Sequence, residues 1–192
     1  YPQKIAIETV NKKISYNNLE KKVFSLIEYF KSKGLKKKQV VAVLLPNSIE
    51  FIYCYLACMI GGFIICPINR ETNTTEIKKI LHSINAKMVI EKKEQLKYFD
   101  TKKDYFRNFD PNRTMGIFLS SGTTGLPKGI CHNSLNILSN ALSFNKDNNI
   151  SKNTRLYHLF PMSYMAGFLN SIISPLLSGG TIVFHSNFSI NF

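Results

Sequence analysis

The stretch FLSSGTTGLPKGICH, residues 118–132, decides how this chain is interpreted. It combines two serines, two threonines, three glycines and a lysine, and it overlaps the end of the apolar run MGIFL at residues 115–119. A short apolar run of this kind predicts a buried strand. We therefore predict that residues 120–128 form a loop between this strand and a helix that begins near Asn133.

The predicted loop has the donors that a phosphate group requires. Its glycines allow backbone amides to approach an anion closely, and its hydroxyl groups can turn toward phosphate oxygens. Its lysine adds a full positive charge. The residues that we expect to bind the phosphates of a triphosphate or pyrophosphate are Ser120, Ser121, Gly122, Thr123, Thr124, Gly125 and Lys128. The alternative is a flexible polar loop on the surface. The spacing differs from the common nucleotide-binding loop, because Pro127 stands where that loop requires its second glycine.

Outward from this stretch, apolar runs alternate with helical patterns. The apolar stripe that starts at Leu19 predicts a helix capped by Asn17 or Asn18, and the run VVAVLL at residues 40–45 predicts a strand covered on both faces. Further strands are expected at residues 63–66, 88–90, 115–119, 155–160 and 181–185, and further helices at residues 48–59, from Thr74 or Thr75, at 133–144 and at 166–177. The charged and aromatic residues 91–113 are expected to form a surface connection. This alternation indicates an α/β fold with a largely parallel β-sheet and flanking helices.

The charge of the chain does not indicate a nucleic-acid partner. The 192 residues have a formal net charge of +13 and are 44% hydrophobic, which is enough for a sizeable core. The positive charge comes mostly from scattered lysines, whereas bidentate contacts to bases and phosphates favour arginine. We interpret the lysines as a solvated surface.

Cysteine spacing and hydropathy favour a cytoplasmic protein without a stable membrane span. Cys54, Cys58, Cys66 and Cys131 lack the spacing of zinc or redox pairs, so buried, reduced thiols are expected. Two long segments contain no Asp, Glu, Lys or Arg, at residues 51–69 and 156–184, and both are interrupted by glycine and proline. No signal peptide is visible in YPQKIAIETV at residues 1–10. Cys131 has no paired catalytic base and is not expected to be a nucleophile.

The segment SSGTTGLPKG, residues 120–129, resembles the characteristic loop of adenylate-forming (AMP-binding) enzymes, which include acyl-CoA synthetases, 4-coumarate–CoA ligases and luciferases. The resemblance extends over essentially the whole chain, through ISYNNLEKKV at residues 14–23 and the segment at residues 40–69. FPMSYMAGF, residues 160–168, is similar to a second motif of the family. Pro161 and Gly167 match that motif, but Tyr164 stands where the family usually has histidine.

The resemblance implies that the protein activates a carboxylic acid with ATP and Mg²⁺. The products are an acyl-adenylate and pyrophosphate, and the acyl group then passes to the thiol of coenzyme A or of a carrier protein. By the same resemblance, Thr124 is a candidate to approach Mg²⁺, and His132, Tyr164, Met165 and Gly167 are candidates for a nucleotide or acyl pocket. Ordinary aromatic packing is the alternative for Tyr164, and a structural role at a helix start is the alternative for His132.

Several motifs of the family do not occur in the 192 residues, among them those that bind adenine and ribose and the lysine of the C-terminal lid. We therefore expect residues 1–192 to be the N-terminal part of an AMP-binding domain without its lid domain. No catalytic residue is identified in this part, which we expect to be inactive alone. The alternative is a non-catalytic phosphate- or nucleotide-binding module. The sequence does not indicate the acid or the oligomeric state.

Overall fold

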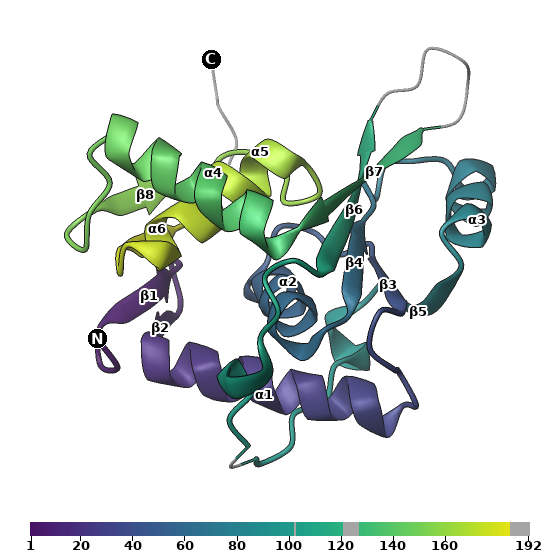
Figure 1. The fold of residues 1–192 in the computed structure, drawn as a ribbon, viewed down its shortest axis with the longest axis horizontal. Coiled ribbons are helices and arrows are strands. Elements are labelled where there is room, and N and C mark those ends of the chain that lie inside the picture. The colour runs from purple at the N-terminus through teal and green to yellow at the C-terminus, as the bar shows by residue number, and fades with distance from the viewer. Residues whose placement is uncertain (102, 121–126, 185–192) are drawn as a thin grey trace.

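The computed structural model describes residues 1–101, 103–120 and 127–184, which form two β-sheets with helices between and around them (Figure 1). The larger sheet has the strand order β5-β3-β4-β6-β7. Its strands are β3 (Val40–Val43), β4 (Ile64–Pro67), β5 (Ala86–Ile90), β6 (Thr114–Ser120) and β7 (Lys128–Asn133). The first four are parallel to one another, and β7 is antiparallel to β6. The prediction of a largely parallel sheet with flanking helices is confirmed.

The smaller sheet has the order β2-β1-β9-β8. It consists of β1 (Ile5–Glu8), β2 (Lys13–Ser15), β8 (Arg155–Tyr157) and β9 (Thr181–Val183). Strand β1 runs parallel to β9 and antiparallel to β2. The first two strands were not predicted, because they are too short for an alternating pattern to be evident. The two ends of the described chain are therefore neighbours in one sheet.

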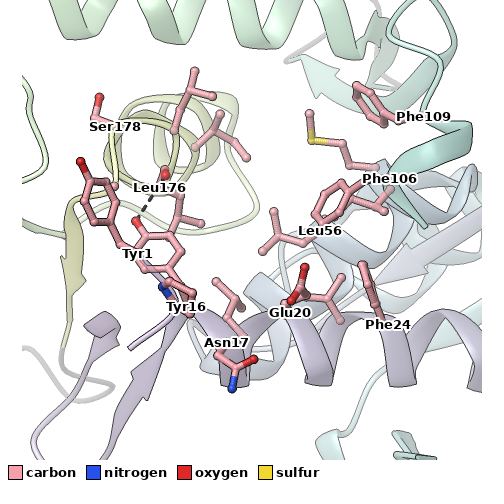
Figure 2. Close-up of a pocket in the computed structure, with 18 of the residues that line it drawn as sticks. Tyr1, Tyr16, Asn17, Glu20, Phe24, Leu56, Phe106, Phe109, Leu176 and Ser178 are labelled. Atoms are coloured by element: carbon pink, nitrogen blue, oxygen red, sulfur yellow. Dashed lines mark hydrogen bonds between the residues drawn. The ribbon is translucent and has the colours of Figure 1, made fainter. Parts of the chain in front are cut away.

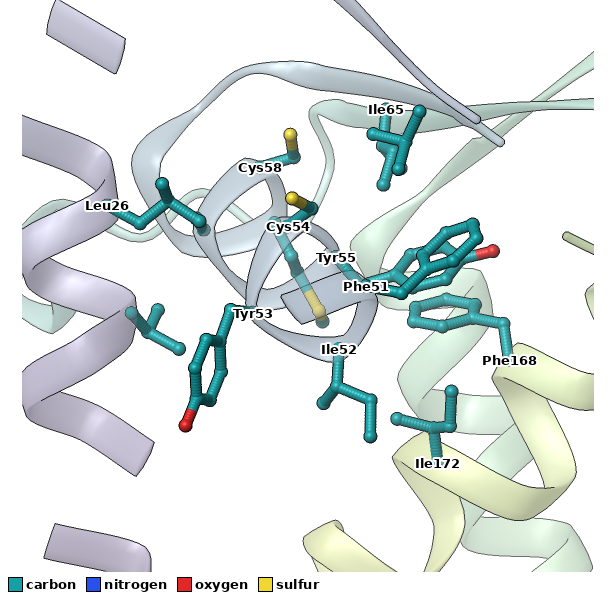
Figure 3. Packing of buried hydrophobic residues seen from close by; sticks show 14 of the residues in the cluster. Leu26, Phe51, Ile52, Tyr53, Cys54, Tyr55, Cys58, Ile65, Phe168 and Ile172 are labelled. Atoms are coloured by element: carbon teal, nitrogen blue, oxygen red, sulfur yellow. The ribbon is translucent and has the colours of Figure 1, made fainter. Parts of the chain in front are cut away.

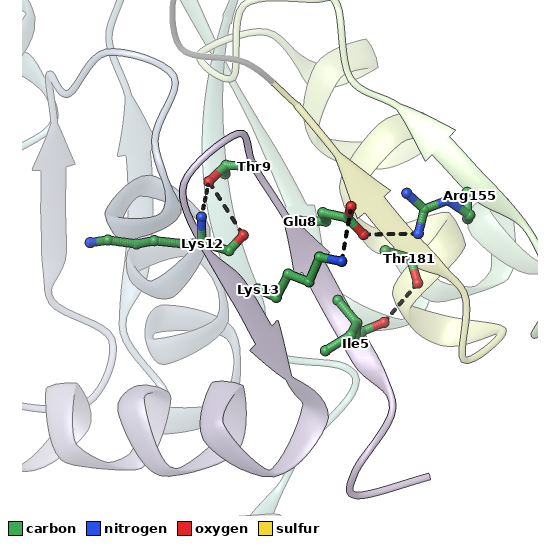
Figure 4. Close-up of polar contacts among 7 residues, drawn as sticks. All are labelled: Ile5, Glu8, Thr9, Lys12, Lys13, Arg155 and Thr181. Atoms are coloured by element: carbon green, nitrogen blue, oxygen red, sulfur yellow. Dashed lines mark hydrogen bonds and ion pairs between the residues drawn. The ribbon is translucent and has the colours of Figure 1, made fainter.

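Polar contacts support this pairing of distant segments (Figure 4). The Glu8 carboxylate lies 2.9 Å from Nη1 of Arg155 and 3.7 Å from Nζ of Lys13. The hydrogen bond from Arg155 is the main reason that the pKa of Glu8 is lowered. The Thr181 hydroxyl donates to the carbonyl oxygen of Ile5 at 2.7 Å. The exposed charges add little stability, so the sheet depends mainly on its backbone pairing and its buried face.

The four longer helices begin at side-chain caps, and the short helical segments after residue 164 do not. The helices are α1 (Tyr16–Ser32), α2 (Ile49–Gly61), α3 (Thr74–Ser83), α4 (Ser134–Asp147), α5 (Met165–Phe168), the π-helical segment η3 (Leu169–Ile173) and α6 (Ser174–Leu177). Ser48 caps α2 as predicted. Ser15 caps α1 in place of Asn17 or Asn18, and Asn73 caps α3 in place of Thr74 or Thr75. Each of these caps accepts a backbone N–H three residues later, which stabilises a helix start.

Helix α2 is the centre of the core (Figure 3). Phe51, Ile52, Cys54, Tyr55 and Cys58 lie on different sides of it, and all five are at most 1% exposed. A helix that is apolar on every side is buried on every side, and α2 packs between α1 and the larger sheet. The predicted buried thiols are confirmed for Cys54, Cys58 and Cys66, whereas Cys131 is exposed.

The connection between β5 and β6 is more buried than predicted. It contains two short 3₁₀ turns, η1 (Lys93–Gln95) and η2 (Phe106–Asn108). Leu96 is buried in the main core, and the ring of Tyr105 lies edge-on to Phe24 with centroids 5.3 Å apart. The aromatic residues of this segment therefore cover α1. Among the described helices, none is long and apolar enough to cross a membrane.

His158 follows β8 and is 3% exposed, as its apolar surroundings predict. Burial lowers its pKa to about 4, against a smaller opposite effect of the Phe160 backbone. Between about pH 6.5 and 4 the unfolded chain binds a proton that the folded chain does not. The free energy of unfolding should therefore fall as the pH is lowered. The fall should approach about 3 kcal/mol at pH 4.

Urea unfolding at pH 7 and pH 4.5 tests this expectation. On going from pH 7 to pH 4.5, the free energy of unfolding of His158→Leu should fall by about 2 kcal/mol less than that of the wild type. The variant His82→Leu, in which an exposed histidine of α3 is replaced, should retain the full loss. Equal losses in wild type and His158→Leu would show that His158 is not buried in its neutral form.

Candidate functional site

The predicted phosphate loop joins two antiparallel strands. The prediction of a strand–loop–helix order is wrong, because residues 128–133 form β7 before helix α4 begins. Ser120 at the end of β6 faces Lys128 at the start of β7 in register, and its hydroxyl donates to the Lys128 carbonyl oxygen at 3.3 Å. The loop ends are thus held together by the edge of the larger sheet.

The hairpin places a cation at the base of the loop. Lys128 is exposed, and within the described parts of the chain it has no acidic partner. Its ammonium group is therefore available to an anion. The predicted phosphate ligands Ser121, Gly122, Thr123, Thr124 and Gly125 lie outside the described residues.

His132 lies in strand β7 and not at a helix start as expected; the cap of α4 is the next residue, Asn133. The His132 ring meets Phe118 of β6 edge-on, with centroids 5.8 Å apart. Phe118 in turn stacks with Phe168 of α5 at 5.7 Å. Aromatic rings therefore connect the hairpin to the second predicted motif.

The second motif spans the turn from β8 into α5. Tyr164 is 51% exposed, Met165 is half-buried against the core, and Gly167 is buried. A Cβ atom on Gly167 would lie 2.4 Å from the carbonyl oxygen of Pro161, so only glycine fits at this position. Of the three candidate pocket residues in this motif, Tyr164 is therefore the one most available to a ligand.

Two residues that sequence reasoning missed hold this motif. The Asn47 side chain donates through Nδ2 to the Phe160 carbonyl oxygen at 2.9 Å and accepts the Met162 N–H through Oδ1 at 2.7 Å. The Tyr55 hydroxyl donates to the Met162 carbonyl oxygen at 2.6 Å. One available signal was that Asn47 follows the carboxyl end of a parallel strand, where binding residues gather in this class of fold.

A cavity of about 630 Å³ lies elsewhere, between α1, α6 and the η2 segment (Figure 2). Its walls are mainly apolar, with side chains such as Phe24, Leu56 and Phe109. The charged side chain in its described lining is the acidic Glu20. No lysine or arginine is among the described lining residues, so this cavity does not suit the phosphates of a nucleotide.

Comparison with known proteins agrees with this arrangement. A family model described as AMP-binding enzyme matches residues 1–106 and 92–191. The chain belongs to the AMP-binding enzyme family. This family consists of adenylate-forming enzymes, as the resemblance of the phosphate loop indicated.

Relatives of this AMP-binding chain include ligases and synthetases. It is 24% identical to 2-succinylbenzoate–CoA ligase of Bacillus pumilus over 99% of the chain and 42% of that relative. It is 26% identical to tyrocidine synthase 3 of Brevibacillus parabrevis over 95% of the chain and 3% of that relative. The chain therefore spans less than half of the length of these relatives.

Solved structures show the same fold. ATP-bound MatB from Rhodopseudomonas palustris superposes with a TM-score of 0.86 at 21% identity, over 98% of the chain and 43% of that structure. MenE from Bacillus subtilis, in complex with the acyl-adenylate OSB-AMP, superposes with a TM-score of 0.86 at 20% identity, over 98% of the chain and 54% of that structure. At these identities the likeness concerns the fold.

Thr124, which was predicted to approach Mg²⁺, lies outside the described residues. Within residues 1–101, 103–120 and 127–184, no group of three or more His, Cys, Asp and Glu side chains is arranged to hold a metal ion.

Proposed function

We propose that the protein to which this chain belongs activates a carboxylic acid with ATP. A carboxylate oxygen forms a bond to the α-phosphorus while the bond from that phosphorus to the bridging oxygen of pyrophosphate breaks. The products are an acyl-adenylate and pyrophosphate. We further propose that the acyl group then passes to a thiol, either that of coenzyme A, as the names of the ligase relatives suggest, or that of a carrier protein.

The observation that carries this proposal is the hairpin of β6 and β7, which presents the exposed Lys128 ammonium group at the base of the loop SSGTTGLPKG. Negative charge builds up on the departing pyrophosphate, so an oriented cation there favours the transition state. We propose that Ser120, Lys128 and the loop donors between them hold the phosphates. Mg²⁺, held near Thr124, would be a second cation at the phosphates.

We also propose that the carboxylic acid binds beside Tyr164, Met165 and Gly167, with His132 toward the nucleotide. Tyr164 replaces the usual histidine of the family motif, and a phenol donates a hydrogen bond without carrying a positive charge at neutral pH. This substitution suits an acid whose carboxylate is held by neutral donors.

Carboxylate-dependent exchange of pyrophosphate into ATP tests the proposed function. The complete gene product should catalyse this exchange with at least one member of a panel of acetate, hexanoate, benzoate, 2-succinylbenzoate and the amino acids. Residues 1–192 alone should show none, because the groups that bind adenosine in the family are not among them. Exchange by neither protein would contradict the proposal and favour a non-catalytic phosphate-binding module.

Pyrophosphate binding should persist in residues 1–192, because the loop donors are local in sequence. Isothermal titration should show that Lys128→Ala binds pyrophosphate about fivefold more weakly than the wild type. The variant Lys21→Ala removes an exposed lysine of α1, far from the hairpin in Figure 1, and should bind like the wild type. Equal weakening in both variants would mean that net charge alone, and not the loop, attracts the anion.

A further inference from the structure

Asn47 joins two segments that are more than one hundred residues apart. It lies between the carboxyl end of β3 and Ser48, the cap of α2. Its amide both donates to the backbone of Phe160 and accepts from the backbone of Met162, at 2.9 and 2.7 Å. An amide side chain combines a donor and an acceptor in one plane, and so it pairs with a chain segment as a neighbouring strand would.

Tyr55 binds the same segment through the other polar group of the Met162 backbone, its carbonyl oxygen. Its hydroxyl donates to the carbonyl oxygen of Met162, and both residues are fully buried. The N–H and the C=O of Met162 are therefore both bound by side chains of the segment at residues 47–55. Moving this peptide would leave buried polar groups unpaired, which is costly.

The fixed peptide determines where the acid-binding candidates lie. The carbonyl oxygen of Pro161, next to Met162, accepts the N–H of Tyr164 at 3.1 Å and contacts Gly167. A shift of the Met162 backbone would therefore also move Tyr164 and the start of α5. The Tyr55 ring also stacks on Phe168 at 4.0 Å, and Phe168 stacks on Phe118 of the hairpin strand β6.

We propose that Asn47 is a positioning residue for the carboxylic acid, which acts by holding the segment at residues 160–167 in place, with the Tyr55 hydroxyl as a second anchor. This inference rests on the proposed function, since that function places the acid beside Tyr164. Neither residue needs to contact the acid. Both act through the backbone of Met162.

Hydrogen–deuterium exchange of residues 1–192 measures the anchoring without any activity. Asn47→Ala should accelerate exchange in peptides that cover residues 158–168 by about tenfold, and Tyr55→Phe should do so less, because it retains the stacked ring. The matched control is Ser48→Ala, which removes the adjacent helix cap and should accelerate exchange only at the start of α2. Unchanged protection at residues 158–168 in Asn47→Ala would overturn the proposal.

Kinetics of the complete gene product measure the positioning. With the best acid of the panel, Asn47→Ala should raise the KM for the acid by about tenfold or more, while the KM for ATP changes by less than about twofold. Asn47→Asp retains the acceptor for Met162 and should recover part of the loss. Parallel changes in both KM values, as expected for Ser48→Ala if it only destabilises the fold, would overturn the proposal. If the wild type catalyses no exchange of pyrophosphate into ATP with any acid of the panel, the proposed function fails. The positioning role then fails with it, whatever the hydrogen–deuterium exchange shows.

Discussion

Replacing Lys128 with alanine is expected to lower the rate of carboxylate-dependent ATP–pyrophosphate exchange by the complete gene product by about 10²–10³. The side chain stands at the first position of β7, in register with Ser120, so its backbone is fixed by the sheet while its ammonium group is exposed. A cation that is oriented before the reaction costs no rearrangement when charge develops on pyrophosphate. Its removal should therefore act on kcat more than on the KM for ATP.

Two control variants separate the role of the Lys128 ammonium group from the effect of net charge. Lys21→Ala makes the same change in net charge on α1, which lies across the molecule from the β6–β7 hairpin (Figure 1), and should retain the wild-type rate. Lys128→Arg keeps the charge but has a different shape, and should recover only part of the activity. If Lys128→Ala raised the KM for ATP without lowering kcat, the lysine would serve binding alone, and its assignment to the transition state would be wrong.

Strands β3 and β4 of the larger sheet could be predicted because they are buried on both faces. Along β3, Val41 and Val43 face α1 and α2, while Val40 and Ala42 face the cluster that includes Ile80 of α3. Such strands are continuous apolar runs bounded by turn residues, which a sequence displays directly. Strands β1 and β2 are short, and β1 also pairs with β9, which lies far along the chain. A local pattern does not contain that information.

The candidate site could be predicted only where its residues are contiguous. The residues KGICHN of β7 are mostly exposed and lie at the edge of the sheet, so they show no apolar alternation and read as a continuation of the loop. Backbone pairing with β6 makes them a strand. Asn47 was missed for a related reason, since its two partners become neighbours only after the chain has folded. The described site is thus built from local motifs held by non-local hydrogen bonds.

Replacing Gly167 with alanine should disrupt the second motif. The added Cβ would lie 2.4 Å from the Pro161 carbonyl oxygen and 3.3 Å from Cβ of Phe160. The nearest neighbour is a backbone atom in a peptide next to Met162, which Asn47 and Tyr55 hold, so the clash cannot be relieved by a side-chain rotation. We expect a loss of about 3 kcal/mol in the free energy of unfolding, at the upper end of what overpacking costs.

The same substitution should reduce activity by more than its effect on stability explains. Relief of the clash requires the Pro161 peptide to move away from α5, and this movement takes Tyr164 with it. A displacement of about 1 Å in a positioning segment can lower a rate by about 10². The rate of ATP–pyrophosphate exchange should therefore fall by about this factor, at a temperature where circular dichroism shows that Gly167→Ala is still folded.

Gly34→Ala is the control, because its Cβ meets no atom within 4 Å and its cost comes only from a φ of +81°. That variant should lose about 1 kcal/mol of stability and no activity. A folded Gly167→Ala protein with the wild-type exchange rate would show that residues 160–167 do not position the acid.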